Sequence, residues 1–214
     1  MTEIILPLIF AYLIGSIPTA VWVGKWFYKV DVREHGSGNA GATNTIRVLG
    51  LKAGIPVLLI DVIKGYIAVL MAPVLFELGG GETMSPYLAI LTAAFAVIGH
   101  TIPVFAGFRG GKGVATLLGV GLGLFPVAAW VAVVIFAVML IATKYVSLSS
   151  ITAGVTFPFF VFFLFPPPNW AYYVLAVAVA IFLPYTHRKN IKRLIEGTES
   201  KLSFSKKKPA NESK

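Results

Sequence analysis

Residues Val114–Thr143, VATLLGVGLGLFPVAAWVAVVIFAVMLIAT, decide how the rest of the chain is arranged. The stretch is apolar and uncharged, with Pro126 near its middle. Its first part, 114–125, is too short at about 1.5 Å per residue to cross a hydrocarbon core of about 30 Å unaided. The stretch is therefore either one long helix kinked at Pro126, or a short helix, a turn at Phe125-Pro126 and a return helix. The choice sets the side of a membrane on which every later segment emerges.

The composition is that of an integral membrane protein. Of the 214 residues, 57% are hydrophobic and only 13% are charged, whereas a soluble domain carries about 25% charged residues. Apolar segments long enough to cross a bilayer are expected near 4–23, 53–76, 86–106, 151–166 and 170–186, besides 127–143 in the opening stretch. The first is preceded by Glu3 rather than by a basic region, so we interpret it as a retained membrane helix and not as a signal peptide. No hydrophilic stretch is long enough for a second domain, and residues 1–200 are expected to form one bundle.

The placement of the basic residues distinguishes the two arrangements. With a short helix and a return helix, 17 of the 18 Lys and Arg residues fall on one side, and only Lys64 does not. The opposite connections, near 77–85, 125–126 and 166–169, contain acidic residues and no Lys or Arg. The positive-inside rule therefore favours an all-α bundle of seven transmembrane helices, one of them short, with the N-terminus outside and the C-terminus inside. A six-helix version remains the alternative.

Two further features follow from charge. The net charge of +9 is attributed to basic loops on one side of the membrane and to a site for an anionic substrate, and not to a nucleic-acid-binding surface. Residues 201–214, with three consecutive lysines, are expected to be a disordered basic tail that touches anionic membrane lipids. Inside the second span, Asp61 and Lys64 have i,i+3 spacing, which favours a structural ion pair over a direct role with substrate.

On the seven-helix topology, four polar segments meet at the basic, cytoplasmic face. In the first, residues 36–47, Ser37 or Asn39 is expected to cap a helix beginning near Ala40. Thr43 and Asn44 then lie one turn before Arg47 on the same face, which suits a polyol phosphate because arginine binds phosphate in bidentate fashion.

The second segment, 99–116, holds Gly110-Gly111-Lys112-Gly113, whose backbone N–H groups and lysine are suited to a phosphate group. It does not match the nucleotide P-loop, because Ala106 stands where the first glycine belongs and Gly113 replaces the magnesium-binding hydroxyl. His100, alone near the inner end of its span, is interpreted as structural.

The third and fourth segments are 145–150 and 187–199. The serines of the third, including Ser149 and Ser150, are expected mainly to cap the next helix. In the fourth, His187 and Asn190 have i,i+3 spacing and share a helix face, which favours a role in the site over a merely basic helix end.

Several familiar chemistries are missing from the sequence. No histidine is followed by aspartate five positions later, there is no G-x-S-x-G motif, and there is no cysteine. A covalent acyl-enzyme of the known kinds is therefore unsupported. No acidic or histidine cluster has metal-ligand spacing, so we expect neither a metal nor another cofactor.

Taken together, the segments resemble the acyl-phosphate:glycerol-3-phosphate acyltransferases of bacterial phospholipid synthesis, the PlsY family. Besides Asp61-x-x-Lys64-Gly65, three long motifs carry the resemblance: Ser37-Gly38-Asn39-x-Gly41-Ala42-Thr43-Asn44-x-x-Arg47, Gly99-His100-x-x-Pro103-x-Phe105 with Phe108-x-Gly110-Gly111-Lys112-Gly113-Val114-Ala115-Thr116, and His187-x-x-Asn190-Ile191-x-Arg193-Leu194-x-x-Gly197-x-Glu199. They cover the chain from about 10 to 200. The basic extension after residue 200 lies outside the family pattern.

The resemblance implies transfer of a fatty acyl group from acyl phosphate to the 1-hydroxyl of glycerol 3-phosphate, giving lysophosphatidate and phosphate at the cytoplasmic face of a bacterial membrane. It implies a catalytic set of Ser37, Arg47, Lys112, His187 and Asn190. The expected substrate-binding residues are Gly38, Asn39, Thr43, Asn44, Gly110, Gly111, Gly113, Ser149 and Ser150. The soluble enzyme that forms acyl phosphate is the expected protein partner.

Our hypothesis for the roles is that Lys112 and the glycines hold acyl phosphate, while Arg47 and Asn190 orient glycerol phosphate. The general base is either His187 or an oxygen of a substrate phosphate. Two other classes remain as alternatives, a transporter of a phosphorylated anionic solute and a non-catalytic scaffold. Clustering of the polar motifs at one face argues against a transporter, whose site lies near the midplane.

Overall fold

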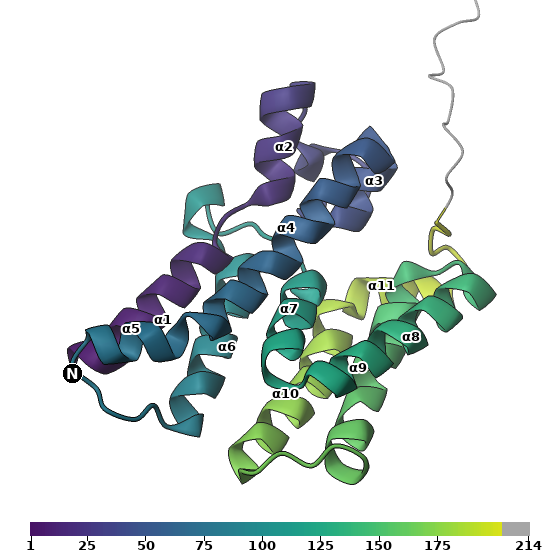
Figure 1. Cartoon of the computed structure of the whole chain (residues 1–214). Helices are drawn as coiled ribbons and strands as arrows, with labels where there is room; N and C mark the ends of the chain where they lie inside the picture. Colours follow the sequence, from purple (N-terminus) through teal and green to yellow (C-terminus); the bar gives the residue numbers. More distant parts are fainter. Residues whose placement is uncertain (203–214) are drawn as a thin grey trace, which may run out of the picture.

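The computed structural model describes residues 1–202, and this part of the chain is helical (Figure 1). In chain order the elements are α1 (Thr2–Gly15), α2 (Thr19–Tyr28), η1 (Val32–Glu34), α3 (Ala42–Leu49), α4 (Leu51–Leu70), α5 (Ala72–Leu78), α6 (Pro86–Thr101), η2 (Val104–Ala106), α7 (Val114–Leu124), α8 (Pro126–Thr143), α9 (Val146–Phe163), α10 (Trp170–Thr186) and α11 (Arg188–Ile195). The predicted all-α class is confirmed.

The helices are those of a multi-pass membrane protein. Within the described residues five spans are long and apolar enough to cross a bilayer, or six if α10 and α11, bent by 59°, count as one, and α7 is a shorter apolar helix. The outer face of α8 shows what surrounds them, because Trp130, Val134 and Ile141 expose 61%, 59% and 79% of their surface. Such a stripe suits lipid and not water. The number of crossings and the orientation stay predictions.

The chain does break at Phe125-Pro126, as the short-helix arrangement requires. Phe125 has φ −140° and ψ 58°, which ends α7, and Pro126 is the first residue of α8. Proline suits that position because the first helical N–H has no intrahelical partner. In Figure 1, α8 runs from this turn back toward α11, and the N-terminus and the α9–α10 connection lie at the opposite end of the molecule. The single kinked helix over 114–143 is therefore wrong.

The first expected span, 4–23, is not one helix. It divides into α1 and α2 around Ser16, Ile17 and Pro18, because proline lacks an N–H and restricts the residue before it. The carbonyl oxygen of Ile17, released from the helical ladder, accepts a hydrogen bond from Lys64 Nζ at 2.9 Å. The span expected at 53–76 is likewise divided, into α4 and α5 at Met71.

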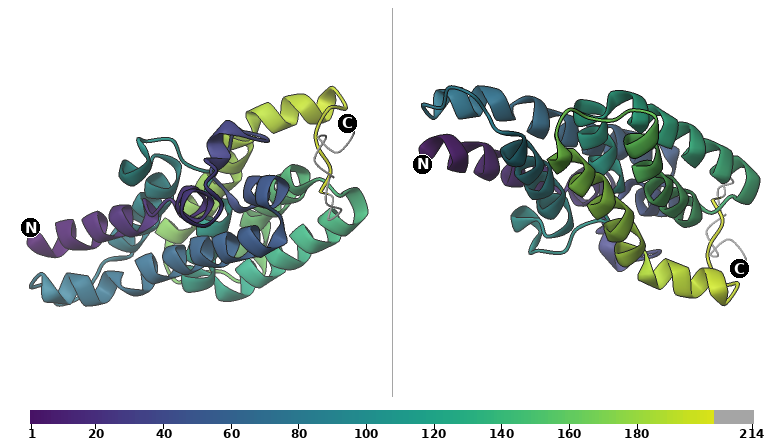
Figure 2. Two further views of the ribbon diagram at one scale, coloured as in Figure 1. Left: turned by 90° about the horizontal axis from the view of Figure 1, so that it is seen from above. Right: turned by 90° about the horizontal axis from the view of Figure 1, so that it is seen from below.

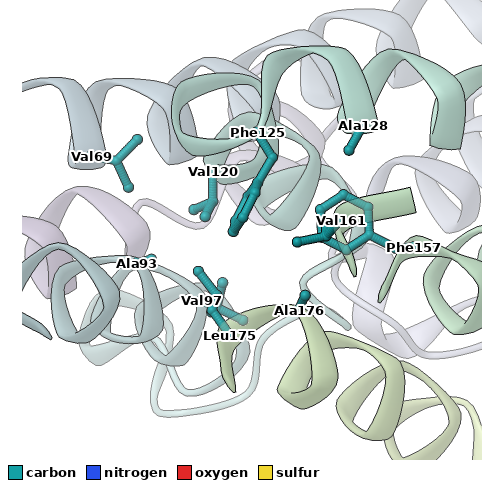
Figure 3. Packing of buried hydrophobic residues seen from close by; sticks show 10 residues of the cluster. All are labelled: Val69, Ala93, Val97, Val120, Phe125, Ala128, Phe157, Val161, Leu175 and Ala176. Atoms are coloured by element: carbon teal, nitrogen blue, oxygen red, sulfur yellow. The ribbon is translucent and has the colours of Figure 1, made fainter. Parts of the chain in front are cut away.

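The core lies where α7 meets α6, α9 and α10. Figure 3 shows Phe125 pointing among the buried side chains of these helices and of α4. The Phe125 ring packs edge-on against Phe157 at 5.5 Å and Tyr172 at 5.7 Å. Such pairs contribute about 1 kcal/mol beyond burial. The turn that sets the topology is thus anchored in the core.

Helices α4 and α7 approach each other closely through glycines. A Cβ atom on Gly65 would lie 2.2 Å from the Thr116 carbonyl oxygen, and one on Gly119 would lie 1.9 Å from the Val62 carbonyl oxygen. Small residues let helix backbones approach this closely in membranes. The contact fixes α7, and with it the loop that precedes α7.

Local expectations at two helix starts are wrong. Helix α3 begins at Ala42 with Gly41 as its N-cap, so neither Ser37 nor Asn39 caps it. Helix α9 begins after Tyr145, and no serine side chain caps it. Of the predicted tail 201–214, residues from 203 on lie outside the described residues. The first two are fixed, since Leu202 donates its N–H to the Lys144 carbonyl oxygen at 2.8 Å and the Lys201 ammonium lies 5.5 Å from the centre of the Tyr145 ring.

Candidate functional site

One cavity of the described structure is lined by residues of all four polar segments. Its volume is about 450 Å³, and its wall is formed by α3, α4, α6, α7, α8, α9, α10 and α11 and the loops before α3 and α7. Figure 1 shows α7 between the N-terminal helices and α8–α11, and Figure 2 shows the same bundle from above and below. The polar lining residues include Ser37, Asn39, Thr43, Arg47, Lys112, Ser147, Ser150, His187, Asn190 and Glu199.

The remaining wall is apolar. Along α9 the lining changes from Ser147 and Ser150 in the first turns to Ala153 and Phe157 further on. Helix α8 adds a row at helical spacing, Ala132, Phe136 and Leu140. A polar end joined to an apolar channel is the shape that an amphiphile with a charged head requires.

Gly110 and Gly111 do not form the phosphate cradle that the sequence predicted. Gly110 donates its N–H to the Thr101 carbonyl oxygen at 3.2 Å, and Gly111 donates its N–H to the His100 carbonyl oxygen at 3.1 Å. Neither glycine lines the cavity. The geometry does not support a direct contact of these two glycines with phosphate, because their N–H groups hold the loop against α6.

The available backbone donors lie one step later in the chain. Gly113, in the left-handed region at φ +81°, is the N-cap of α7, and the first helical bond runs from Leu117 N–H to its carbonyl oxygen at 2.7 Å. The backbone N–H groups of the residues before Leu117 therefore point out of the N-terminus of α7 and have no partner within the helix. Gly113, Val114 and Ala115 line the cavity. This helix end carries a partial positive charge beside the Lys112 side chain and is suited to an anion.

Lys112 is less basic than an ordinary lysine. Its ammonium donates to the Asn190 side-chain oxygen. Burial lowers the pKa of Lys112 to about 8, the attraction of Glu199 opposes this, and repulsion from Arg193 and Arg47 adds to it. Lys112 and Arg47 are two cations that line the same cavity. Two anionic groups are therefore accommodated more easily than one.

Asn190 is held by Glu199. The Asn190 amide nitrogen donates to Glu199 Oε1 at 2.7 Å, and Arg193 Nε donates to Glu199 Oε2 at 2.6 Å. Ser147 completes the set, donating its hydroxyl to Glu199 Oε1 at 2.8 Å. Although burial raises the pKa of Glu199, these hydrogen bonds bring it below its usual value. Glu199 is therefore an anion that orients the Asn190 oxygen toward Lys112.

His187, the first residue beyond α10, is buried and neutral. Its Nδ1 lies 2.8 Å from the Leu183 carbonyl oxygen, which only accepts, so Nδ1 carries the proton and Nε2 is left as an acceptor. Burial lowers the pKa of His187 to about 4, and the positive charge of Lys112 acts in the same direction. Such an imidazole orients a hydroxyl well but is a weak base at neutral pH.

The first polar segment is organised from inside by Asn44. Its side-chain oxygen accepts from the Ser37 N–H at 2.8 Å and the Ser37 hydroxyl at 3.1 Å, and its nitrogen donates to the carbonyl oxygens of Val32 and His35. No donor or acceptor of this amide is left for a ligand. Asn44 lines the cavity, but because its amide is engaged within the chain the geometry assigns it to positioning Ser37 and does not support the predicted substrate contact.

Two other predicted binding residues lie outside the cavity. Gly38, at φ +72°, forms the turn after His35 and does not line the cavity, so its role is conformational. Ser149 is fully buried and donates its hydroxyl to the Tyr145 carbonyl oxygen at 2.8 Å. Ser150 lines the cavity but donates in the same way to Val146. Asn39, Thr43 and Arg47 line it as predicted.

Comparison with known proteins gives this arrangement a family. Residues 5–197 match the family model of glycerol-3-phosphate acyltransferases. The glycerol-3-phosphate acyltransferase of Listeria monocytogenes serovar 1/2a is 46% identical over 202 residues, covering 94% of this chain and 98% of that protein. That of Streptococcus equi subsp. equi is 44% identical over 220 residues, covering 98% and 99%. The chain belongs to the PlsY glycerol-3-phosphate acyltransferase family.

Solved structures of the family agree with the fold. The crystal structure of PlsY, an integral membrane glycerol 3-phosphate acyltransferase in its glycerol 3-phosphate form, matches with a TM-score of 0.83 at 38% identity, covering 94% of this chain and 96% of that one. The lysophosphatidic acid form matches with a TM-score of 0.80. The helical arrangement of this PlsY-family chain is thus shared.

Sequence reasoning on this PlsY-family chain missed Glu199 and Ser147 as members of the site. Glu199 is one of two acids, with Glu196, in a strongly basic segment, and nothing in the sequence distinguishes the two. The row Ala132, Phe136, Leu140 was also missed, because α8 is apolar all round and its sequence does not mark the face toward the cavity.

Proposed function

We propose that this chain transfers a fatty acyl group from acyl phosphate to the 1-hydroxyl of glycerol 3-phosphate, giving lysophosphatidate and phosphate. One observation carries the proposal: Lys112, Arg47 and the N-terminus of α7 line the polar end of a cavity whose other end is apolar. A phosphate with a long acyl chain and a second, small phosphate are the ligands that such a cavity suits.

Each phosphate has a separate cation in this scheme. The acyl phosphate lies with its phosphoryl oxygens against Lys112 and the amides of residues 113–115. Glycerol 3-phosphate is held by Arg47, with Thr43 and Asn39 as neutral donors to its hydroxyls and the Ser37 hydroxyl oxygen as an acceptor. Two fixed cations offset the repulsion between the phosphates and hold the two reactants together, which contributes to catalysis through orientation and charge.

The reaction balances without a covalent enzyme intermediate. The 1-hydroxyl oxygen attacks the acyl carbonyl carbon, the bond from that carbon to the phosphate oxygen breaks, and phosphate leaves with the electron pair. The hydroxyl proton ends on a phosphate oxygen, so no strong protein base is required. Nε2 of His187 accepts a hydrogen bond from the hydroxyl and orients it, which fits the lowered pKa of this side chain.

The apolar end provides for the acyl chain. Each buried CH₂ group contributes about 0.8 kcal/mol, so the channel between α8, α9 and α10 holds the donor strongly. We place the site at the cytoplasmic face of a bacterial cell membrane, where the soluble acyl-phosphate-forming enzyme would supply the donor. The transport alternative loses its main support, since Lys64 is already bonded to Asp61 and to the Ile17 carbonyl oxygen.

The test is turnover by the purified protein in detergent. Palmitoyl phosphate and glycerol 3-phosphate should give equal amounts of lysophosphatidate and phosphate without coenzyme A, and palmitoyl-coenzyme A should give none. The Lys112→Met variant should lose nearly all activity, whereas Thr92→Val, a buried change on α6 away from the cavity, should keep it. Absence of lysophosphatidate from folded wild-type protein would overturn the proposal.

A further inference from the structure

A buried network of polar groups lies at the wall of the cavity, where Asp61 and His100 are among the lining residues, and it takes no part in the chemistry proposed above. Asp61 Oδ1 lies 2.7 Å from Lys64 Nζ, accepts from the Thr19 hydroxyl at 3.1 Å and lies 3.7 Å from His100 Nδ1. All four side chains are at most 6% exposed. Unpaired charges are costly at this depth, so such a network persists only when every member has partners.

The network joins three helices and the break between α1 and α2. Thr19 begins α2, Asp61 and Lys64 belong to α4, and His100 lies in the last turn of α6. Lys64 also donates to Ile17, at the break between α1 and α2. The Asp61 carboxylate already accepts from these groups, and its negative charge would repel a phosphate. A direct contact of Asp61 with substrate is therefore disfavoured.

His100 connects this network to the loop that contains Lys112. A Cβ atom on Gly111 would lie 2.2 Å from His100 Nε2, so the Gly111 backbone rests on the imidazole edge opposite Nδ1. The Gly111 N–H also bonds to the His100 carbonyl oxygen. The imidazole thus stands between the Asp61 carboxylate and the residue that precedes Lys112.

A second contact supports the far side of the same loop. Gly65, next to Lys64, lies against the Thr116 carbonyl oxygen in the first turn of α7, with no space for a side chain. One face of α4 therefore supports the chain on both sides of Lys112: at Gly111 through His100, and at Thr116 directly. Interiors packed this closely transmit small shifts of one group to its neighbours.

We propose that Asp61 and His100 are positioning residues, which hold the 110–113 loop at the height where Lys112 and the N-terminus of α7 reach the phosphate of the acyl donor. The inference rests on the proposed function, because it takes the donor phosphate as the ligand of Lys112. Since a displacement of about 1 Å costs up to a hundredfold in rate, the network acts on donor capture through the position of this loop.

Steady-state kinetics with palmitoyl phosphate and glycerol 3-phosphate test this. His100→Ala and Asp61→Asn should raise the KM for palmitoyl phosphate about tenfold or more and change the KM for glycerol 3-phosphate less than threefold. His100→Gln, which fills the same space with a polar side chain, should recover part of the loss. Thr92→Val removes a buried hydroxyl from the same helix and should leave both constants unchanged.

A readout without turnover separates positioning from activity. The chain has no cysteine, so Lys112→Cys introduces a single thiol at the site. Its rate of labelling by a small cationic thiosulfonate should change at least threefold when His100→Ala is added, and should not change with Thr92→Val. Wild-type turnover with unaltered donor KM and labelling in the His100 and Asp61 variants would overturn this inference alone. Absence of wild-type turnover would overturn the proposed function instead.

Discussion

The lowered pKa of Lys112 predicts how donor capture depends on pH. With a pKa of about 8, about nine-tenths of the Lys112 side chains are charged at pH 7 and about one-tenth at pH 9. A bound phosphate keeps the proton on the lysine, so the loss is expected in kcat/KM, which reports the free enzyme, and not in kcat. The value of kcat/KM for palmitoyl phosphate should fall about tenfold from pH 7 to pH 9.

The assay is the initial rate of phosphate release at low palmitoyl phosphate and saturating glycerol 3-phosphate. The phosphate groups of the substrates do not confuse the result, because their second ionisation, near pH 6, is nearly complete at pH 7. The matched variant is Lys112→Arg, whose guanidinium stays charged over this range. Its kcat/KM is expected to be lower but independent of pH between 7 and 9.

A second variant keeps the prediction testable if arginine does not fit. Glu199 raises the pKa of Lys112 by attraction, so Glu199→Gln should move the fall in kcat/KM to lower pH. A flat wild-type profile, or the same profile in Lys112→Arg, would refute the assignment of this pKa to donor capture.

Three further predictions concern other parts of the molecule. Because the pKa of His187 is about 4, the ionisation of His187 should add no fall in kcat between pH 7 and pH 5.5 to that of the substrate phosphates near pH 6, and an inflection near pH 6.5 that disappears in His187→Gln would contradict this. Ala132→Phe narrows the apolar wall, so the ratio of palmitoyl phosphate to lauroyl phosphate turnover should drop at least fivefold, and an unchanged ratio would place the acyl chain elsewhere. Gly119→Ala puts a methyl group 1.9 Å from the Val62 carbonyl oxygen, so the unfolding temperature in detergent should fall by several degrees, whereas an unchanged temperature would show that α4 and α7 separate easily.

Much of the fold could be predicted from the sequence because a bilayer restricts the length of the helices that cross it. A crossing helix needs about 20 apolar residues, and a proline at a helix start and a one-sided charge distribution are both visible in the sequence. The turn at Phe125-Pro126 and the Asp61–Lys64 pair follow from such local rules. The break between α1 and α2 was missed, because a proline inside an apolar segment is compatible with either a kinked or a divided helix.

Part of the site was readable for a similar reason. Spacing and residue type placed Arg47, Lys112, His187 and Asn190 among its candidates, and the structure brings all four to one cavity. The geometry does not support a predicted contact where a residue's hydrogen bonds are used by another part of the chain. Asn44 and Gly111 belong to motifs that suit phosphate binding, yet their donors and acceptors are already occupied.

The sequence alone therefore determined the membrane class, the helical segments and most of the charged and polar groups of the site. Only the tertiary structure decided which of those groups are free to bind a ligand and which hold the others in place. The reason is physical: apolar length and charge are properties of one segment, whereas burial, hydrogen-bond pairing and the lowered pKa of Lys112 arise when α3, α7, α9 and α11 meet.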